Sequence, residues 1–224
     1  MTSSTTRSPP APVERSAADG PTAAVKQRLG WFCAHPAAHA RFLNTLSLME
    51  HIGSRKIMAS QAERGLGGET LRHLAEETRH AYFFKRAAEK LAHRPLGYGT
   101  GETIADPAAR GYMERLDAGI LHELDGAADT ALPYLYMSLI VELRAVWFYR
   151  LYQETLAEHQ QNLSLRSVLA EEELHLGAML ARLTGMDKDC APRVKRFQAL
   201  ELERFRVLWD AIEAECSGER LAAE

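Results

Sequence analysis

The sequence has few cysteines, no long apolar run and no strong excess of either charge. Its three cysteines are widely separated and form no Cys-x-x-Cys pair. This argues against a thiolate zinc site or a rubredoxin-type iron site and favours a reducing compartment. No apolar stretch reaches the roughly 18 residues that span a bilayer, and the first residues lack the apolar segment of a secretory signal. The formal net charge of −3 gives no general attraction for nucleic acid or an anionic membrane. We therefore expect a cytoplasmic protein that binds neither nucleic acid nor membranes.

Strand patterns are also missing, because no segment rich in Val, Ile and Thr alternates with polar residues between hairpin turns. The shares of apolar residues, 46%, and charged residues, 25%, are those of a soluble globular protein, so the sequence predicts an all-α fold. Residues 1–21 are rich in Ser, Thr, Pro and Ala without apolar periodicity, and we expect a disordered tail there. The rest is interpreted as a single helical domain, residues 22–216.

Four long helices are predicted from apolar periodicity and from the Pro and Gly residues that bound it. They cover residues 36–62, 69–93, 133–156 and 163–184. The 36 residues from Pro95 to Thr130 far exceed the roughly two to eight that join adjacent antiparallel helices. They hold a shorter helix, about 107–124, so this connection is expected to cross the bundle. The predicted fold is a four-helix bundle, core 36–184, with a long crossover and flanking helices, the last over residues 192–216.

Acidic residues occupy positions on the apolar faces of these four helices. The second and fourth helices each carry a Glu-x-x-His sequence in which the glutamate and histidine lie one turn apart on the inward face. The first and third helices each contribute one inward glutamate. The six candidate residues are Glu50, Glu77, His80, Glu142, Glu172 and His175.

The placement of these residues carries more weight than the motif. With 22 Glu and 9 His in the chain, about one Glu-x-x-His is expected by chance. In an antiparallel hairpin, residues at the same height are equidistant from the turn. The midpoint between the candidates of the first two helices falls near residue 64, beside a Gly-rich turn, and that of the other two near residue 158, at a polar break. Both hairpins therefore place their candidates at one level.

Charge indicates what such a cluster is for. Four carboxylates in a low-dielectric core repel one another and lose hydration, which costs several kcal/mol per ion unless a cation compensates. Two divalent cations would neutralise the four glutamates, and two imidazoles would complete the ligand set. Mixed carboxylate and imidazole ligation suits iron or manganese better than structural zinc. Two iron ions are the expected cofactor, and a manganese and iron pair or two manganese ions stay open.

This pattern resembles that of the ferritin-like di-iron carboxylate superfamily, with one Glu from each of two helices and Glu-x-x-His from each of the other two. The resemblance covers about residues 36–184. It is closer to rubrerythrins, bacterioferritin and oxygen-activating enzymes than to animal ferritins, whose fourth helix lacks the histidine. The chain lacks the Cys-x-x-Cys module of rubrerythrin and has Val146 where multicomponent monooxygenases place a threonine. The resemblance implies that the six candidates are metal ligands and that Glu77 and Glu172 bridge the two metals.

Several neighbouring residues have two interpretations. His73, one turn before Glu77, fits a partly exposed histidine or one that supports a ligand better than an extra ligand. Tyr149 fits a packed tyrosine with a hydrogen-bonded hydroxyl better than a redox-active or substrate-facing one. Gly53 leaves room for oxygen or substrate, or simply allows close helix packing. Three flanking glutamates are expected to be solvated: Glu76, Glu171 and Glu173.

The resemblance and the extra helices favour an oxidoreductase that activates dioxygen or peroxide at a di-iron centre and acts on a small organic substrate. Such an enzyme also needs an external electron donor. The alternative is iron oxidation, iron storage or peroxide removal by a ferritin-like or rubrerythrin-like protein, and a metal-free helical scaffold is the third hypothesis. The sequence leaves the substrate and the oligomeric state undecided, including a homo-oligomer.

Overall fold

The computed structural model describes residues 22–60, 67–124 and 131–223, and these form seven α-helices without any β-strand. The all-α prediction is confirmed for this part of the chain. The predicted tail, residues 1–21, lies outside the described residues. The helices are α1 (Thr22–Ala34), α2 (Pro36–Ser60), α3 (Gly68–Ala92), α4 (Asp106–Glu123), α5 (Leu132–Glu158), α6 (Arg166–Met186) and α7 (Cys190–Ala223).

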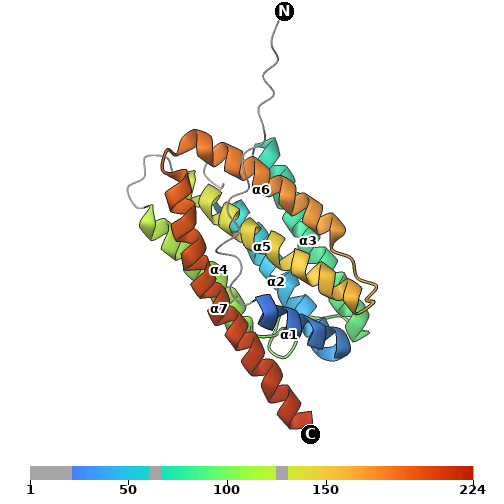
Figure 1. The fold of residues 1–224 in the computed structure, drawn as a ribbon. Coiled ribbons are helices and arrows are strands. Elements are labelled where there is room, and N and C mark those ends of the chain that lie inside the picture. The colour runs from blue at the N-terminus through green and yellow to red at the C-terminus, as the bar shows by residue number, and fades with distance from the viewer. Residues whose placement is uncertain (1–21, 61–66, 125–130, 224) are drawn as a thin grey trace, which may run out of the picture.

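Two pairs of consecutive helices, α2 with α3 and α5 with α6, pack side by side (Figure 1). Pro36 opens α2 and Pro133 lies in the first turn of α5, where the missing N–H leaves no hydrogen bond unmade. The helix α3 ends where His93 takes a left-handed conformation, at a φ of 54°, just before Arg94-Pro95. These ends agree with the boundaries expected from the sequence.

The boundaries of α6 differ from the prediction. The helix begins at Arg166 rather than at residue 163, and it continues through Gly185 to Met186. Gly185 directly follows the predicted end at residue 184 and is expected from the sequence to cap the helix, but it lies within the helix. The N–H of Asp187 still donates to the carbonyl of Leu183, so the helical turn extends past the glycine. A glycine ends a helix when it adopts a left-handed conformation, and Gly185 does not adopt one.

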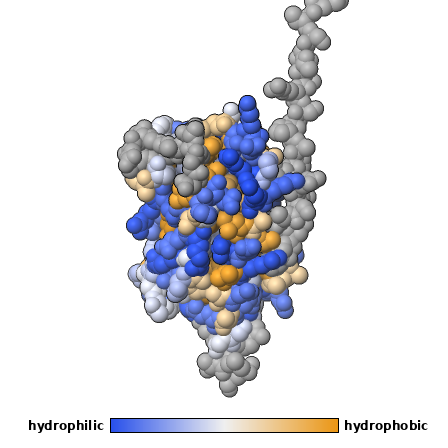
Figure 2. All heavy atoms as spheres, turned by 90° about the vertical axis from the view of Figure 1, so that its left-hand side faces the viewer, coloured by the Kyte–Doolittle hydropathy of each residue, from blue (hydrophilic) through white to orange (hydrophobic). Residues whose placement is uncertain are grey.

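The remaining helices cover the α2 and α5 side. Helix α4 packs against α7, α2 and α5, and α7 also reaches α5, while α1 lies against α2 and α5. The helix α7 is longer than the predicted 192–216, and its C-terminal end projects beyond the other helices (Figure 1). Figure 2 views the α4 and α7 side, where apolar atoms lie between hydrophilic side chains.

The apolar core extends from the helix pairs to these covering helices. Among the described side chains, the largest that are fully buried include Phe42 of α2, Phe84 of α3, Tyr152 of α5 and Phe197 of α7. No helix in the described part of the chain has the length and hydropathy that a membrane crossing requires.

Candidate metal centre

The six predicted residues lie together, and His73 joins them. They form two groups in which each residue offers one ligand atom, and within a group these atoms all lie within 4.8 Å of one another. Glu77 belongs to both groups, so the two groups share a carboxylate. The first group is His73, Glu77, Glu142 and His175, and the second is Glu50, Glu77, His80 and Glu172.

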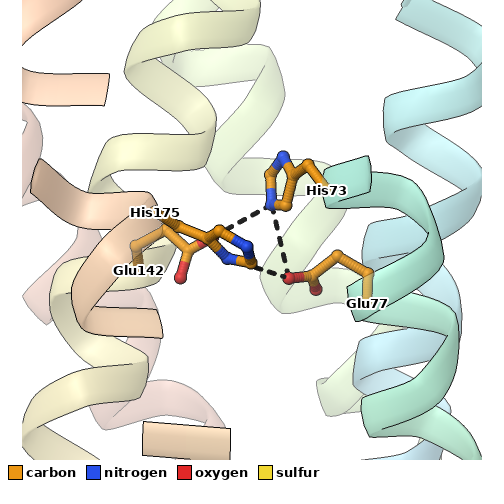
Figure 3. Close-up of side chains that lie close together, drawn as sticks. All are labelled: His73, Glu77, Glu142 and His175. Carbon is orange, nitrogen blue, oxygen red and sulfur yellow. Dashed lines mark hydrogen bonds and ion pairs between the residues drawn. The ribbon is translucent and has the colours of Figure 1, made fainter. Parts of the chain in front are cut away.

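The first group joins three helices, as Figure 3 shows: α3 supplies His73 and Glu77, α5 supplies Glu142, and α6 supplies His175. His73 Nε2 lies 3.1 Å from Glu142 Oε1 and 3.3 Å from Glu77 Oε1. His175 Nδ1 lies 3.5 Å from Glu142 Oε1 and 3.8 Å from Glu77 Oε1. All four residues are buried. The imidazole nitrogens and carboxylate oxygens thus converge on one small volume.

The second group adds α2. His80 Nδ1 lies 3.1 Å from Glu172 Oε1 and 3.9 Å from Glu77 Oε1. Glu50, from α2, accepts a hydrogen bond from the Tyr149 hydroxyl of α5. This bond links two helices that face each other across the centre and leaves the rest of the Glu50 carboxylate for a metal.

The two Glu-x-x-His histidines are each held from the facing helix. His80 Nε2 lies 2.7 Å from Glu171 Oε2 of α6, and His175 Nε2 lies 2.6 Å from Glu76 Oε2 of α3. The expectation that Glu76 and Glu171 are merely solvated is therefore wrong, because both are partly buried and fix the orientation of a histidine. The third of these glutamates, Glu173, is exposed as expected and pairs with Arg150.

A repeated signal in the sequence could have revealed this arrangement. In both helices the ligand glutamate follows another glutamate, which gives Glu-Glu-x-x-His twice. Each first glutamate reaches the histidine of the other helix, so the two bonds cross. Carboxylates that hold the outer nitrogen of a ligand histidine are common in metal sites, because they fix the ring and its tautomer.

The expected environment is wrong for His73 and agrees with the structure for Tyr149. His73 is 6% exposed, so the description of a partly exposed histidine is wrong, and its Nε2 faces the cluster while Nδ1 lies 3.2 Å from the Tyr134 hydroxyl. Tyr149 is buried against Phe84 and donates to Glu50, as the packed interpretation predicts. His73 is thus in position to be a seventh ligand.

Burial and mutual repulsion disturb the acidity of the carboxyl groups. Burial, with repulsion from Glu77 and Glu172, raises the pKa of Glu50 well above its ordinary value. Burial and the neighbouring Glu172 raise the pKa of Glu142 to about 8. Burial acts in the same direction on Glu172, but its contacts with Glu142, His175 and His80 outweigh it and lower the pKa. Glu50 and Glu142 therefore hold their protons more tightly than isolated carboxyl groups do.

The pKa values of the three histidines are also raised. Burial alone lowers a histidine pKa, but the surrounding carboxylates outweigh it. The pKa is raised to about 9 for His73, about 10 for His80 and about 11 for His175. Protons on these rings take the place that metal cations take in a loaded site.

The atoms that face inward fit metal ions. Within the described residues, five buried atoms of the cluster have no hydrogen-bond partner: Nδ1 of His80 and of His175, Glu77 Oε1, Glu142 Oε2 and Glu172 Oε2. Buried polar atoms are rarely left unpaired, and a metal ion would satisfy these. A set of carboxylates and imidazoles suits iron, manganese or other divalent cations, and the geometry does not select among them. The described residues thus contain a buried His/Glu cluster that could hold metal.

Two cavities meet at this cluster. A chamber of about 100 Å³ is lined by the carboxylates and by apolar side chains of α2, α4, α5 and α7. A larger cleft of about 620 Å³ borders it on the side of Lys56 and Asp117. Both share the lining residues Gly53, Met113 and Val141. A methyl group on Gly53 would lie 3.6 Å from Glu77 Oε2, so this glycine keeps space open beside a ligand.

Comparison with known proteins adds no relative. No family model, curated protein or solved structure matches this chain. What the chain shows is an all-α fold with a buried cluster of histidines and glutamates, suited to metal ions.

Proposed function

We propose that the protein is a di-metal oxidoreductase that uses dioxygen or peroxide to oxidise a small organic substrate. In this proposal α2, α3, α5 and α6 form a ferritin-like four-helix bundle, and the connection that contains α4 is its crossover. The observation that carries the proposal is the pair of overlapping ligand groups that share Glu77, with buried ligand atoms that have no partner among the described residues.

Each ligand has a role in this proposal. Glu77, which belongs to both groups, would serve both metal ions; Glu142, His73 and His175 would hold one ion, and Glu50, His80 and Glu172 would hold the other. His73 gives one site a second imidazole, so the two sites are unequal. Two iron ions, or manganese in one or both sites, supply the electrons that reduce dioxygen or peroxide when bound. Glu76 and Glu171 keep the two Glu-x-x-His rings aimed inward.

The chamber supports an oxidoreductase over an iron-storage protein. It places an apolar space directly against four of the ligand carboxylates, closed by helices that lie outside the four-helix set. Storage of iron requires passage of hydrated ions and has no use for such a space. The three cysteines are separate and buried, so the proposal includes an external electron donor.

The test is anaerobic loading with ferrous iron, followed by exposure to air or hydrogen peroxide. We expect about two irons per chain and rapid oxygen consumption. Glu142→Ala abolishes the oxygen consumption while the helical circular dichroism stays intact, because Glu142 touches both histidines of its site. Glu173→Ala is the matched control, since Glu173 is exposed and pairs only with Arg150 among the described residues.

Three results would contradict the proposal. Oxygen consumption that Glu142→Ala leaves unchanged would exclude this centre, and failure to bind iron would favour a metal-free scaffold. A shell of many subunits that accumulates ferric mineral would assign the alternative, iron storage.

A further inference from the structure

The lining of the chamber beside the cluster combines carboxylates with apolar side chains. The carboxylates belong to the cluster, and the walls are mainly apolar, with Phe42 and Leu46 of α2, Phe148 of α5, and Leu208 and Ile212 of α7. Such walls exclude charged and strongly hydrated molecules, because desolvation without a partner is unfavourable. A ligand of the chamber must therefore be largely apolar.

Arg144 and Trp209, which both line the chamber, each carry one hydrogen-bond donor without a partner in the described part of the chain. Arg144 Nη1 and Trp209 Nε1 are buried without a hydrogen bond among the described residues. The Arg144 side chain is 9% exposed and Trp209 is 4% exposed. Both groups only donate hydrogen bonds, so what they lack is an acceptor. Phe205 contacts both, lying 4.3 Å from the Arg144 guanidinium and 5.8 Å from the Trp209 ring, so the two donors share one part of the wall.

The charge of Arg144 is already balanced. Its Nε and Nη2 donate to the two oxygens of Glu201 at 2.8 and 2.6 Å, and Tyr112 donates to the same carboxylate at 2.8 Å. The pair is therefore neutral, while Nη1 keeps its hydrogens. A ligand carboxylate here would bring an unbalanced negative charge into a chamber that glutamates already line. The fit is to an uncharged acceptor.

We propose that the substrate of this centre is an uncharged, mainly apolar molecule with one hydrogen-bond-accepting oxygen, such as a carbonyl, which Arg144 and Trp209 bind in the chamber. The role of this molecule as a substrate rests on the proposed function. Its binding in the chamber does not, because binding requires no oxidation. Arg144 and Trp209 are thus assigned as specificity-determining residues.

The size of the chamber limits the ligand. A cavity of roughly 150 Å³ lined by apolar side chains holds benzene, and this chamber, of about 100 Å³, shares part of its lining with the larger cleft. Met49 and Met113 line it, and methionine side chains adjust easily to an occupant. A five-membered ring is the appropriate probe.

Three matched fluorinated probes test the proposal by ¹⁹F NMR titration: 3,3-difluorocyclopentanone, 1,1-difluorocyclopentane and 3,3-difluorocyclopentanecarboxylate. The titrations use zinc-loaded protein, which cannot turn over, and metal-free protein. We expect the ketone to bind about tenfold more tightly than the hydrocarbon, as one or two hydrogen bonds provide. The carboxylate is expected to bind most weakly.

Variants then locate the binding. Trp209→Phe keeps an aromatic ring but removes Nε1, and Arg144→Lys keeps a positive charge for Glu201 but removes the fixed guanidinium donor. Each should lower the ketone affinity severalfold and leave the hydrocarbon affinity unchanged. Trp31→Phe is the control, because Trp31 lies on α1 and does not line the chamber. Ala145→Leu fills part of the chamber and should abolish binding of both probes.

Equal affinity for ketone and hydrocarbon, tightest binding of the carboxylate, or full ketone affinity in Trp209→Phe and Arg144→Lys would overturn the proposal. Unchanged binding in Ala145→Leu would place the probes elsewhere and also overturn it. These outcomes are separate from the proposed function. If the ketone binds selectively but the iron-loaded protein consumes no oxygen, the oxidoreductase proposal is rejected and the binding site is kept. If the iron-loaded protein consumes oxygen but does not distinguish the probes, the binding site is rejected and the oxidoreductase proposal is kept.

Discussion

Helix α5 carries two buried charges, two residues apart, that are neutralised in different ways. Arg144 forms a two-pronged pair with Glu201 of α7, and its partner carboxylate also accepts a hydrogen bond from Tyr112. Glu142 lies among other carboxylates, and its Oε2 has no hydrogen-bond partner among the described residues. The charge of Arg144 is balanced within the protein by Glu201, whereas the charge of the carboxylate cluster is balanced only by protons or metal ions.

This difference separates a structural use of buried charge from a functional one. A paired charge fixes how α5 meets α7, and removing one partner leaves the other uncompensated. An unpaired cluster has little structural benefit, since burying like charges is unfavourable. Bound cations would offset the cost of burying these carboxylates in the core.

The largest effect is expected from breaking the complete pair. Arg144→Met leaves Glu201 buried and unpaired, which should lower the free energy of unfolding by about 3 to 5 kcal/mol. The double variant Arg144→Met/Glu201→Met removes both charges and should recover most of that loss. Urea unfolding of the single and double variants measures both values, and a loss below about 1 kcal/mol in Arg144→Met would show that the pair is not structurally important.

Binding of zinc ions by the cluster should stabilise the folded protein. Zinc at one hundred times its dissociation constant is expected to raise the free energy of unfolding by about 2.7 kcal/mol per site. Glu77→Gln should remove most of this increase, because Glu77 belongs to both ligand groups. Thermal unfolding with zinc and with added chelator measures the increase. An equal zinc effect in Glu77→Gln would place the metal elsewhere.

Loosening the histidines should weaken the metal sites without removing a ligand. Glu76→Gln and Glu171→Gln are each expected to lower metal affinity about 10- to 100-fold, since a neutral amide holds the outer ring nitrogen less firmly. Competition with a chelator of known affinity measures the change. Glu173→Gln provides the comparison on the same helix as Glu171 and should keep the original affinity.

The smallest expected effect is on the pH dependence of stability, and it comes from a third buried group, His39, whose ring is neutral in the folded protein. Burial lowers its pKa from 6.5 to about 4. The unfolded chain therefore takes up a proton below pH 6.5 that the folded chain refuses, and stability falls as the pH drops. This contribution is about 1 kcal/mol between pH 7 and pH 5.5. His39→Gln should unfold with a correspondingly weaker pH dependence, and an unchanged dependence would contradict the assignment.

The sequence predicts which glutamates and histidines gather in the core, because their positions follow from helical periodicity and from the distance to each turn. The same rules fail where a contact depends on a neighbouring helix. Glu76 and Glu171 lie off the inward face of their own helices, and only the close approach of α3 and α6 turns them toward a histidine. Glu201 and Arg144 meet across α5 and α7, 57 positions apart, where no periodicity relates them.

The most direct test of the central claim is anomalous X-ray diffraction at the iron absorption edge from crystals of iron-loaded protein. The account predicts two strong peaks roughly 3.5 to 4 Å apart, one beside His73, Glu142 and His175, the other beside Glu50, His80 and Glu172, with Glu77 touching both. A single peak at the cluster, or iron peaks only at the protein surface, would contradict this account.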